Sequence, residues 1–197
     1  MSTGRPSALA ALLGQARVAF EAADVRAPAR DAGRWLFDTL ATPGAPAPPA
    51  PGTAVPVCAH LDPALATARG LGGPIAHAAE AIAALAPALC WRLRAGTPAD
   101  DPFARAHGNA ELVGRAGLER RLDVTVGLSL VAPGTTYPDH HHPPEEIYVV
   151  LSAGEWRQTD GPWHAPGPGG VVHNPPGIVH AMRALDTPLL ALWLLRM

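Results

Sequence analysis

The hydrophobic residues of this chain follow two different spacings, one in each part of the sequence. In the first third, Leu9, Leu12, Leu13, Ala16 and Phe20 recur at steps of three and four residues, which predicts an amphipathic helix. Ser7 precedes this stripe and is expected to cap the helix. Three more helices are expected: one with Trp35, Leu36 and Leu40 on one face, one from Asp62 as N-cap to Gly70, and one from about Pro74 to Pro87.

From Ala110 onward the period changes to two, which is typical of strands. Glycine and proline turns separate the short runs, which lie at 111–113, 122–131, 147–151, 171–172, 182–185 and 189–195. Asp160-Gly161 predicts a tight hairpin, whose two-residue loop would put Trp156 and Trp163 on one face. This spacing of short strands favours an all-β barrel or sandwich.

A proline- and alanine-rich stretch at 42–56 cannot form a helix or a central strand. It is either a linker between domains or a connection that crosses the surface of one domain. We therefore divide the chain into a helical N-terminal portion, residues 1–108, and a β portion, residues 109–197. At 197 residues the chain is long enough to bury a core.

Composition excludes several classes of function. The formal net charge of −2 gives no electrostatic footprint for nucleic acid, and all 15 basic residues are arginine, so no lysine can form a Schiff base. Cys58 and Cys90 match no metal spacing and are expected to be reduced core residues. The Ala/Leu run after Met1 is unlike a signal peptide, and the apolar end 189–195 is too short to span a bilayer. We expect a cytoplasmic protein without a membrane partner.

The candidate chemistry is concentrated between Gly134 and His180, where six of the nine histidines and both tyrosines lie. In extended chain alternate residues share a face, so His140 and His142 point one way, and Glu146 and Tyr148 share a face further on. The set His140, His142, Glu146 and His180 is therefore the predicted ligand set for a divalent transition metal. Mixed His/Glu ligation suits Zn, Fe, Mn or Ni. His141 and Glu145 should point away, and the isolated His60, His77 and His107 are expected to be structural or exposed.

The joint spacing decides against a merely solvated histidine loop. Gly134-x5-His140-x-His142-x3-Glu146, followed by Gly169-x5-Pro175-x-Gly177-x2-His180, resembles both halves of the cupin metal motif. That resemblance implies a small β-barrel in which two hairpins bring four ligands together. Two departures are visible, because one extra residue precedes Gly154 and Ala184 stands where many cupins place Asn. The expected fold is mainly β, a cupin (double-stranded β-helix) barrel with a helical N-terminal portion.

A narrower resemblance covers the chain from about residue 109 to the end. Tyr137-Pro-x-His140-x-His142-x3-Glu146-x-Tyr148, together with Pro175-Pro-Gly-x2-His180-Ala-Met and Pro188-Leu-Leu-Ala-x-Trp193, is similar to the bacterial cupin-type dimethylsulfoniopropionate lyases and their lyase-like relatives. The resemblance implies metal binding by the four residues above, β-elimination of dimethylsulfoniopropionate to dimethyl sulfide and acrylate, Tyr148 as general base and Tyr137 as a second site tyrosine.

The residues make this chemistry intelligible. A divalent metal that binds a substrate carboxylate stabilises charge at the neighbouring carbon and favours a nearby phenolate over a phenol. Trp156, Trp163 or Trp193 is a candidate to face a sulfonium cation, although core packing is the commoner role for each. An oxygenase or isomerase acting on another small carboxylate, and a non-enzymatic small-ligand-binding cupin, remain open alternatives. The sequence also leaves the oligomeric state open, with a homodimer as one option.

Overall fold

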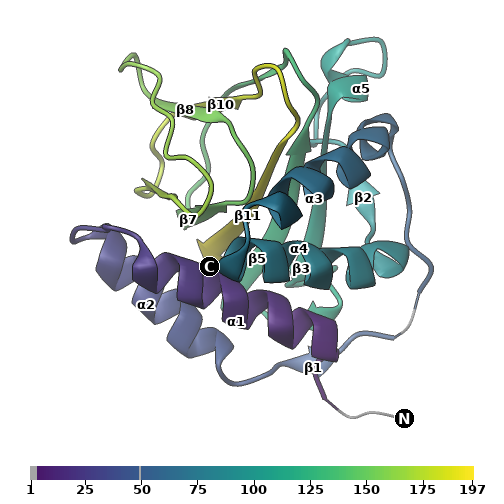
Figure 1. Cartoon of the computed structure of the whole chain (residues 1–197), viewed down its shortest axis with the longest axis vertical. Helices are drawn as coiled ribbons and strands as arrows, with labels where there is room; N and C mark the ends of the chain where they lie inside the picture. Colours follow the sequence, from purple (N-terminus) through teal and green to yellow (C-terminus); the bar gives the residue numbers. More distant parts are fainter. Residues whose placement is uncertain (1–3, 49) are drawn as a thin grey trace.

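The protein is described by a computed structural model that covers residues 4–48 and 50–197, with helices mostly in the first half and strands in the second (Figure 1). The helices are α1 (Ser7–Ala22), α2 (Ala29–Leu40), α3 (Leu61–Gly70), α4 (Gly73–Leu85) and the short α5 (Phe103–Ala106). Two 3-10 turns, η1 (Pro56–His60) and η2 (Ala86–Ala88), precede α3 and follow α4. The predicted helical N-terminal portion is therefore confirmed.

Two of the predicted helix starts are wrong, by one residue for α1 and by two residues for α3. α1 begins at Ser7 itself, with Pro6 at the N-cap position and no side-chain cap hydrogen bond. α3 begins at Leu61, so Asp62 lies in its first turn, where a carboxylate interacts favourably with the helix dipole, and does not cap it. The predicted ends are correct, because Gly70 is the last residue of α3 and Pro87 lies in the 3-10 turn that ends α4.

The strands of the described residues form two sheets. The larger has the order β1-β4-β3-β5-β11-β7-β9, with β2 paired to β3, and the smaller has the order β6-β10-β8. The strands are β1 (Ala45–Pro46), β2 (Trp91–Arg92), β3 (His107–Val113), β4 (Glu119–Arg120), β5 (Val124–Val131), β6 (Thr136–His140), β7 (Glu145–Val150), β8 (Glu155–Gln158), β9 (Val171–Asn174), β10 (His180–Arg183) and β11 (Leu189–Arg196).

Side-chain alternation along the central strands divides the core in two. In β7, Ile147 and Val149 join the core shared with the helices, whereas Tyr148 and Val150 join a second core with residues of the small sheet. Successive side chains of a strand point to opposite faces, so the larger sheet packs against the helices on one face and against the smaller sheet on the other (Figure 1). The site lies in the second of these layers.

The proline-rich stretch contacts the sheet on both sides of Pro49, which itself lies outside the described residues. β1 pairs with β4, and Thr53 forms an isolated bridge with Cys90. Farther along, β3 begins at His107, just before the predicted division between residues 108 and 109. One hydrophobic core contains residues of the helices and of the large sheet. The division into a helical portion and a barrel portion therefore follows a change of secondary structure, and its bounds stay a prediction.

The hairpin at Asp160-Gly161 corrects one prediction. Trp156 pairs with His164, and the turn is closed by a hydrogen bond from the Gly161 N–H to the Gln158 carbonyl at 3.0 Å. This register differs by one residue from that of a two-residue loop, and such a shift moves side chains to the opposite face. Trp156 is consequently buried at 1% exposure, while Trp163 is half-buried and its ring contacts the guanidinium groups of Arg157 and Arg183.

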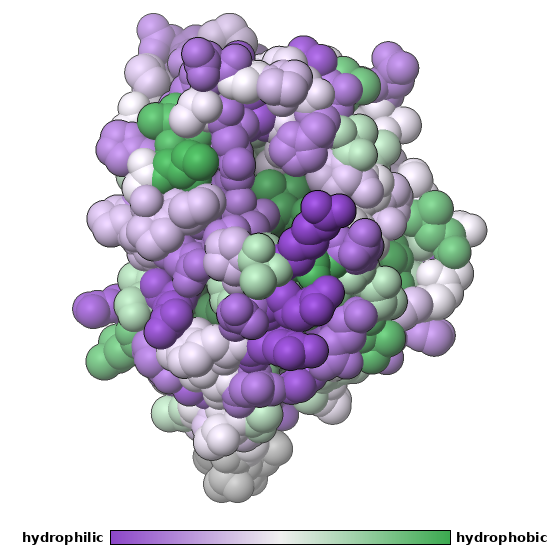
Figure 2. Space-filling model, turned by 90° about the vertical axis from the view of Figure 1, so that its left-hand side faces the viewer, coloured by the Kyte–Doolittle hydropathy of each residue, from purple (hydrophilic) through white to green (hydrophobic). Residues whose placement is uncertain are grey.

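Figure 2 shows one side of the molecule, which is mostly hydrophilic with hydrophobic residues in separate small patches. Cys58 and Cys90 are free thiols, as predicted, but both are only half-buried. In the part of the chain that the structure describes, no helix combines the length and the hydrophobicity needed to cross a membrane.

Candidate metal centre

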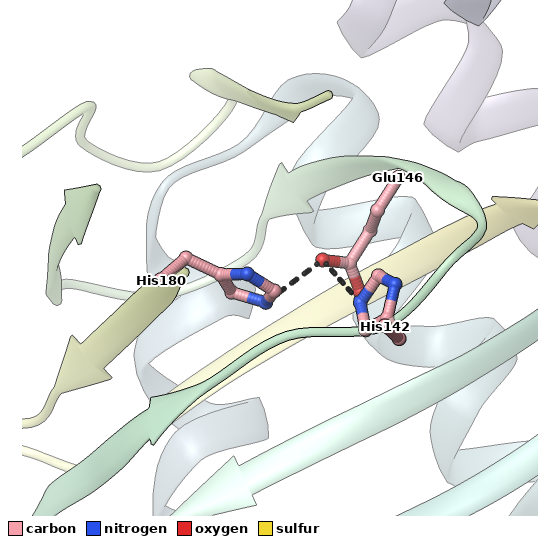
Figure 3. A group of neighbouring side chains, drawn as sticks. All are labelled: His142, Glu146 and His180. Carbon is pink, nitrogen blue, oxygen red and sulfur yellow. Dashed lines mark ion pairs between the residues drawn. The ribbon is translucent and has the colours of Figure 1, made fainter. Parts of the chain in front are cut away.

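Three ligand side chains of the predicted site converge at one point inside the barrel. His142 lies in the turn between β6 and β7, Glu146 lies on β7 and His180 begins β10, and Figure 3 shows the two imidazoles facing the same carboxylate. The donor atoms of the three residues all lie within 4.8 Å of one another. Each Nε2 is 3.3 Å from Glu146 Oε2. Two imidazoles and one carboxylate form a donor set that suits a divalent transition metal.

The backbone fixes the tautomer of each histidine. Nδ1 of His140 lies 3.0 Å from the Pro138 carbonyl, Nδ1 of His142 lies 2.9 Å from the Pro144 carbonyl, and Nδ1 of His180 lies 3.1 Å from the Ile178 carbonyl. A carbonyl only accepts, so each Nδ1 carries a proton, and Nε2 is the nitrogen that a neutral ring leaves free to bind a metal. This is the arrangement that orients metal-binding histidines. Nε2 of His180 is buried and has no hydrogen-bond partner among the described residues, so the site fits a metal ion.

His140 is close to this group but is not part of it. Its ring centroid lies 4.1 Å from that of His180 and 6.3 Å from that of His142, and it lines the same cavity. Burial, aided by the nearby His180, lowers its pKa to about 4, so it presents a neutral imidazole. The structure thus brings together three of the four predicted ligands, and His140 remains a prediction as the fourth.

The carboxylate of Glu146 is held ionised by its neighbours. Burial alone would raise its pKa, but the neighbouring imidazoles of His142 and His180 outweigh burial and lower the pKa to about 2. The same contact raises the pKa of His142, despite partial burial of that ring. His142 would have to be neutral to hold a metal, so a metal and a proton would compete for its Nε2.

A second layer of contacts, which the sequence analysis did not identify, holds Glu146. Asn174, on β9 directly opposite Glu146, donates from Nδ2 to Glu146 Oε2 at 2.8 Å. Gln158 on β8 donates in turn from Nε2 to Asn174 Oδ1 at 2.8 Å. Asn174 is fully buried. The only sequence signal was its parity with Val172 on β9, which becomes informative once the register with β7 is known.

Both predicted tyrosines line the cavity of about 230 Å³ that contains His140, His142 and Glu146. Tyr137 on β6 accepts a hydrogen bond of 3.4 Å from Asn109 Nδ2, and Ser129 Oγ donates to Asn109 Oδ1 at 2.6 Å. Burial raises the pKa of Tyr137. For Tyr148 burial and then the adjacent Glu146 raise the pKa well above its ordinary value. A phenolate at Tyr148 therefore requires a cation close by.

Comparison with known proteins identifies the relatives of this chain. Residues 30–191 match the dimethylsulfoniopropionate lyase family. This chain belongs to that family. It is 33% identical over 131 residues to the proposed dimethylsulfoniopropionate lyase DddL of Cereibacter sphaeroides, and 36% identical over 86 residues to the dimethylsulfoniopropionate lyase DddQ of Ruegeria pomeroyi. These alignments cover 66% and 43% of this chain. They cover 54% and 43% of the two relatives, so the chain spans about half the length of the curated relatives it matches.

Solved structures of the family superpose on nearly the whole chain. The crystal structure of dimethylsulfoniopropionate lyase DddQ from Ruegeria pomeroyi gives a TM-score of 0.73 at 27% identity, with 96% of this chain and 91% of that chain covered. A structure from the work on the lyases RdDddP and RnDddQII gives a TM-score of 0.71 at 28% identity, with 97% and 93% covered. The predicted cupin barrel with a helical N-terminal portion is confirmed.

The other residues singled out in the sequence of this dimethylsulfoniopropionate lyase family member differ in whether they line the site cavity. His141 is exposed, and Glu145 accepts from His173 Nε2 at 2.9 Å on the opposite face of β7 from Glu146. His77 is exposed and His60 half-buried. Among the three candidate tryptophans, only Trp193 lines the site cavity. His107 is fully buried beneath Tyr137, with which its ring forms an edge contact.

Proposed function

We propose that this chain is a metal-dependent carbon–sulfur lyase that splits dimethylsulfoniopropionate into dimethyl sulfide and acrylate by β-elimination. The observation that carries the proposal is the convergence of His142, Glu146 and His180, with tautomers that free both Nε2 atoms, in a member of the dimethylsulfoniopropionate lyase family. His140 would complete the ligand set. The substrate is then a small carboxylate that also carries a sulfonium group.

When bound, the metal, one of Zn, Fe, Mn or Ni, supplies a positive charge that stabilises the developing negative charge of the substrate and lowers the pKa of a nearby phenol. Tyr148 is the proposed general base, because it lies two residues from Glu146 on the same face of β7 and lines the cavity. Tyr137, on the facing strand β6, is the second tyrosine that orients the substrate.

The step conserves atoms and electrons without a further reactant. The Tyr148 phenolate removes the proton from the carbon next to the carboxylate. The electron pair of that C–H bond forms the C=C bond of acrylate as the C–S bond breaks. The C–S electron pair stays on sulfur, which leaves as neutral dimethyl sulfide. The proton is then held on the hydroxyl of Tyr148, a residue that is 3% exposed.

The product assay tests the proposal directly. Metal-loaded wild type is incubated with dimethylsulfoniopropionate, and acrylate and dimethyl sulfide are measured together by proton NMR and gas chromatography. We expect equal amounts of the two products. Release of neither product by fully loaded protein would overturn the proposal. Oxygen consumption or a different product from another small carboxylate would then favour an oxygenase or isomerase at the same site.

A further inference from the structure

One cation on the wall of the site cavity has no role in the mechanism above. Arg94 lies in the connection between β2 and α5 and lines the cavity together with His140, Glu146 and Tyr148. Its side chain is half-buried. Among the described residues no carboxylate forms an ion pair with it, whereas Arg157 and Arg183 on the neighbouring sheet each have an acidic partner. We propose that Arg94 binds the substrate carboxylate and makes the cavity selective for small carboxylates over neutral ligands. This inference rests on the proposed function only for the identity of the substrate.

The backbone of Arg94 is fixed, which leaves its side chain available for a ligand. The Arg94 N–H donates to His107 Nε2 at 2.8 Å, and His107 Nδ1 donates to the Phe103 carbonyl at 2.6 Å. The rings of Phe103 and His107 stack with centroids 3.6 Å apart and planes 5° from parallel. His107 is fully buried. His107 therefore holds the loop that contains Arg94 against the start of β3.

The guanidinium group is directed at the cavity by an aromatic contact. Its central carbon lies 5.7 Å from the ring centroid of Tyr137, within the range of a cation–π interaction. Tyr137 also has its ring centroid 4.8 Å from that of His140. The cation therefore stands beside the second site tyrosine and near the proposed metal ligands. A carboxylate in the cavity would meet a planar donor with paired N–H groups, the geometry that arginine offers to carboxylates.

The charges of the cavity also favour an anionic ligand. Glu146 is the single carboxylate on the cavity wall, and it already accepts from Asn174 and contacts His142 and His180. With a divalent metal bound, the ionic groups of the wall, which are the metal, Glu146, Arg94 and the proposed Tyr148 phenolate, still sum to a positive charge. A cation beside a metal weakens metal binding by repulsion, and an incoming carboxylate removes that repulsion. In a zwitterionic substrate Arg94 would also repel the sulfonium group, so the molecule can enter in one orientation.

Arg92 provides a matched control. It lies two residues earlier, on β2, and its exposed side chain lines a neighbouring cavity, which shares Asn109 and Trp193 with the site cavity but contains neither Arg94 nor a predicted metal ligand. Arg92→Gln and Arg94→Gln change the net charge of the protein equally, but only the second removes a cation from the site cavity. Arg94→Lys keeps the charge and loses the paired donors.

The experiment measures binding of propionate and of its neutral analogue propionamide by NMR titration, with and without metal. In metal-loaded protein we expect Arg94→Gln to weaken propionate binding on the order of 10- to 100-fold, as for loss of a hydrogen-bonded charge. The affinity of Arg94→Lys for propionate should lie between those of wild type and Arg94→Gln. Arg92→Gln should bind propionate as wild type does, and the metal content should be the same in all variants. In the lyase assay the KM of Arg94→Gln should rise, while its kcat should stay within a few-fold of the wild-type value, as for an interaction made equally in the ground state and the transition state.

Wild-type affinity for propionate in Arg94→Gln would overturn the inference. If that variant does not fold, the metal-free wild type is measured instead. A preference for propionate over propionamide that disappears when the metal is removed would assign carboxylate recognition to the metal alone and overturn the inference. The two proposals fail separately. Arg94-dependent propionate binding without release of dimethyl sulfide would refute the lyase and leave the carboxylate site standing. Lyase activity with an unchanged KM in Arg94→Gln would refute the carboxylate site at Arg94 and leave the lyase proposal standing.

Discussion

Removal of the Asn174 amide should weaken metal binding without touching a ligand. Asn174 donates to Glu146 Oε2 at 2.8 Å and is fully buried. A hydrogen bond to a charged group is worth about 1.5–3 kcal/mol, and loss of such an outer contact typically lowers metal affinity about 10- to 100-fold. In Asn174→Ala, Gln158 keeps a partner, because its Nε2 also donates to the His173 carbonyl. We therefore expect a Kd for metal about 10- to 100-fold higher than in wild type.

Competition with a chromogenic chelator at fixed pH measures this Kd, and thermal unfolding of the metal-free proteins checks the fold. Ser152→Ala is the matched control. Ser152 is also fully buried and hydrogen-bonded on both sides, to the Pro188 carbonyl and from the Leu190 N–H, but it does not line the site cavity. Both variants should lose stability, and only Asn174→Ala should lose metal affinity. A folded Asn174→Ala with the wild-type Kd would refute the argument that Asn174 orients Glu146.

Three further outcomes follow from the structure. Tyr148→Phe should keep fold and metal content but lose elimination activity by on the order of 10²–10⁴; acrylate release at the wild-type rate would assign the base elsewhere. His141→Ala should keep metal and activity within a few-fold, because the side chain is exposed, and metal loss would contradict the alternation argument. Arg5→Ala should destabilise the fold by about 3–5 kcal/mol at neutral pH, since Arg5 Nη2 donates at 2.9 Å to the fully buried Glu119. Burial raises the pKa of Glu119, but Arg5 and Gly44 outweigh burial and lower the pKa. The stabilisation by Arg5 should therefore be fully present above the ordinary carboxyl pKa and should fade as the pH falls through the lowered pKa. Chemical denaturation of wild type and Arg5→Ala at several pH values tests this, and a pH-independent difference would contradict it.

Local spacing was sufficient where the chain is regular. In β7 the predicted alternation is confirmed, with Glu146 facing the site and Glu145 bonded to His173 on the other face. It was sufficient because period-two geometry fixes the face of every residue once one is buried. The helices were predicted correctly from their apolar stripes. The N-caps predicted at Ser7 and Asp62 were wrong, because capping depends on the side-chain geometry of one residue.

Features that depend on register or on distant chain segments were not predictable. Trp163 was misplaced because a one-residue change in the hairpin turn reverses the faces of a strand. Asn174 joins the site only through the pairing of β9 with β7. Arg94 reaches the cavity from a loop far from the histidine motif, and a lone arginine in the sequence indicates no site.

A metal titration tests the central claim most directly. Metal-free wild type is titrated with one divalent transition metal, and acrylate release from dimethylsulfoniopropionate is followed alongside bound metal. The account predicts no release without metal, a linear rise, and a plateau at about one metal per chain, with His180→Ala inactive over the same range. Acrylate release by the metal-free protein, or none at full occupancy, would contradict it.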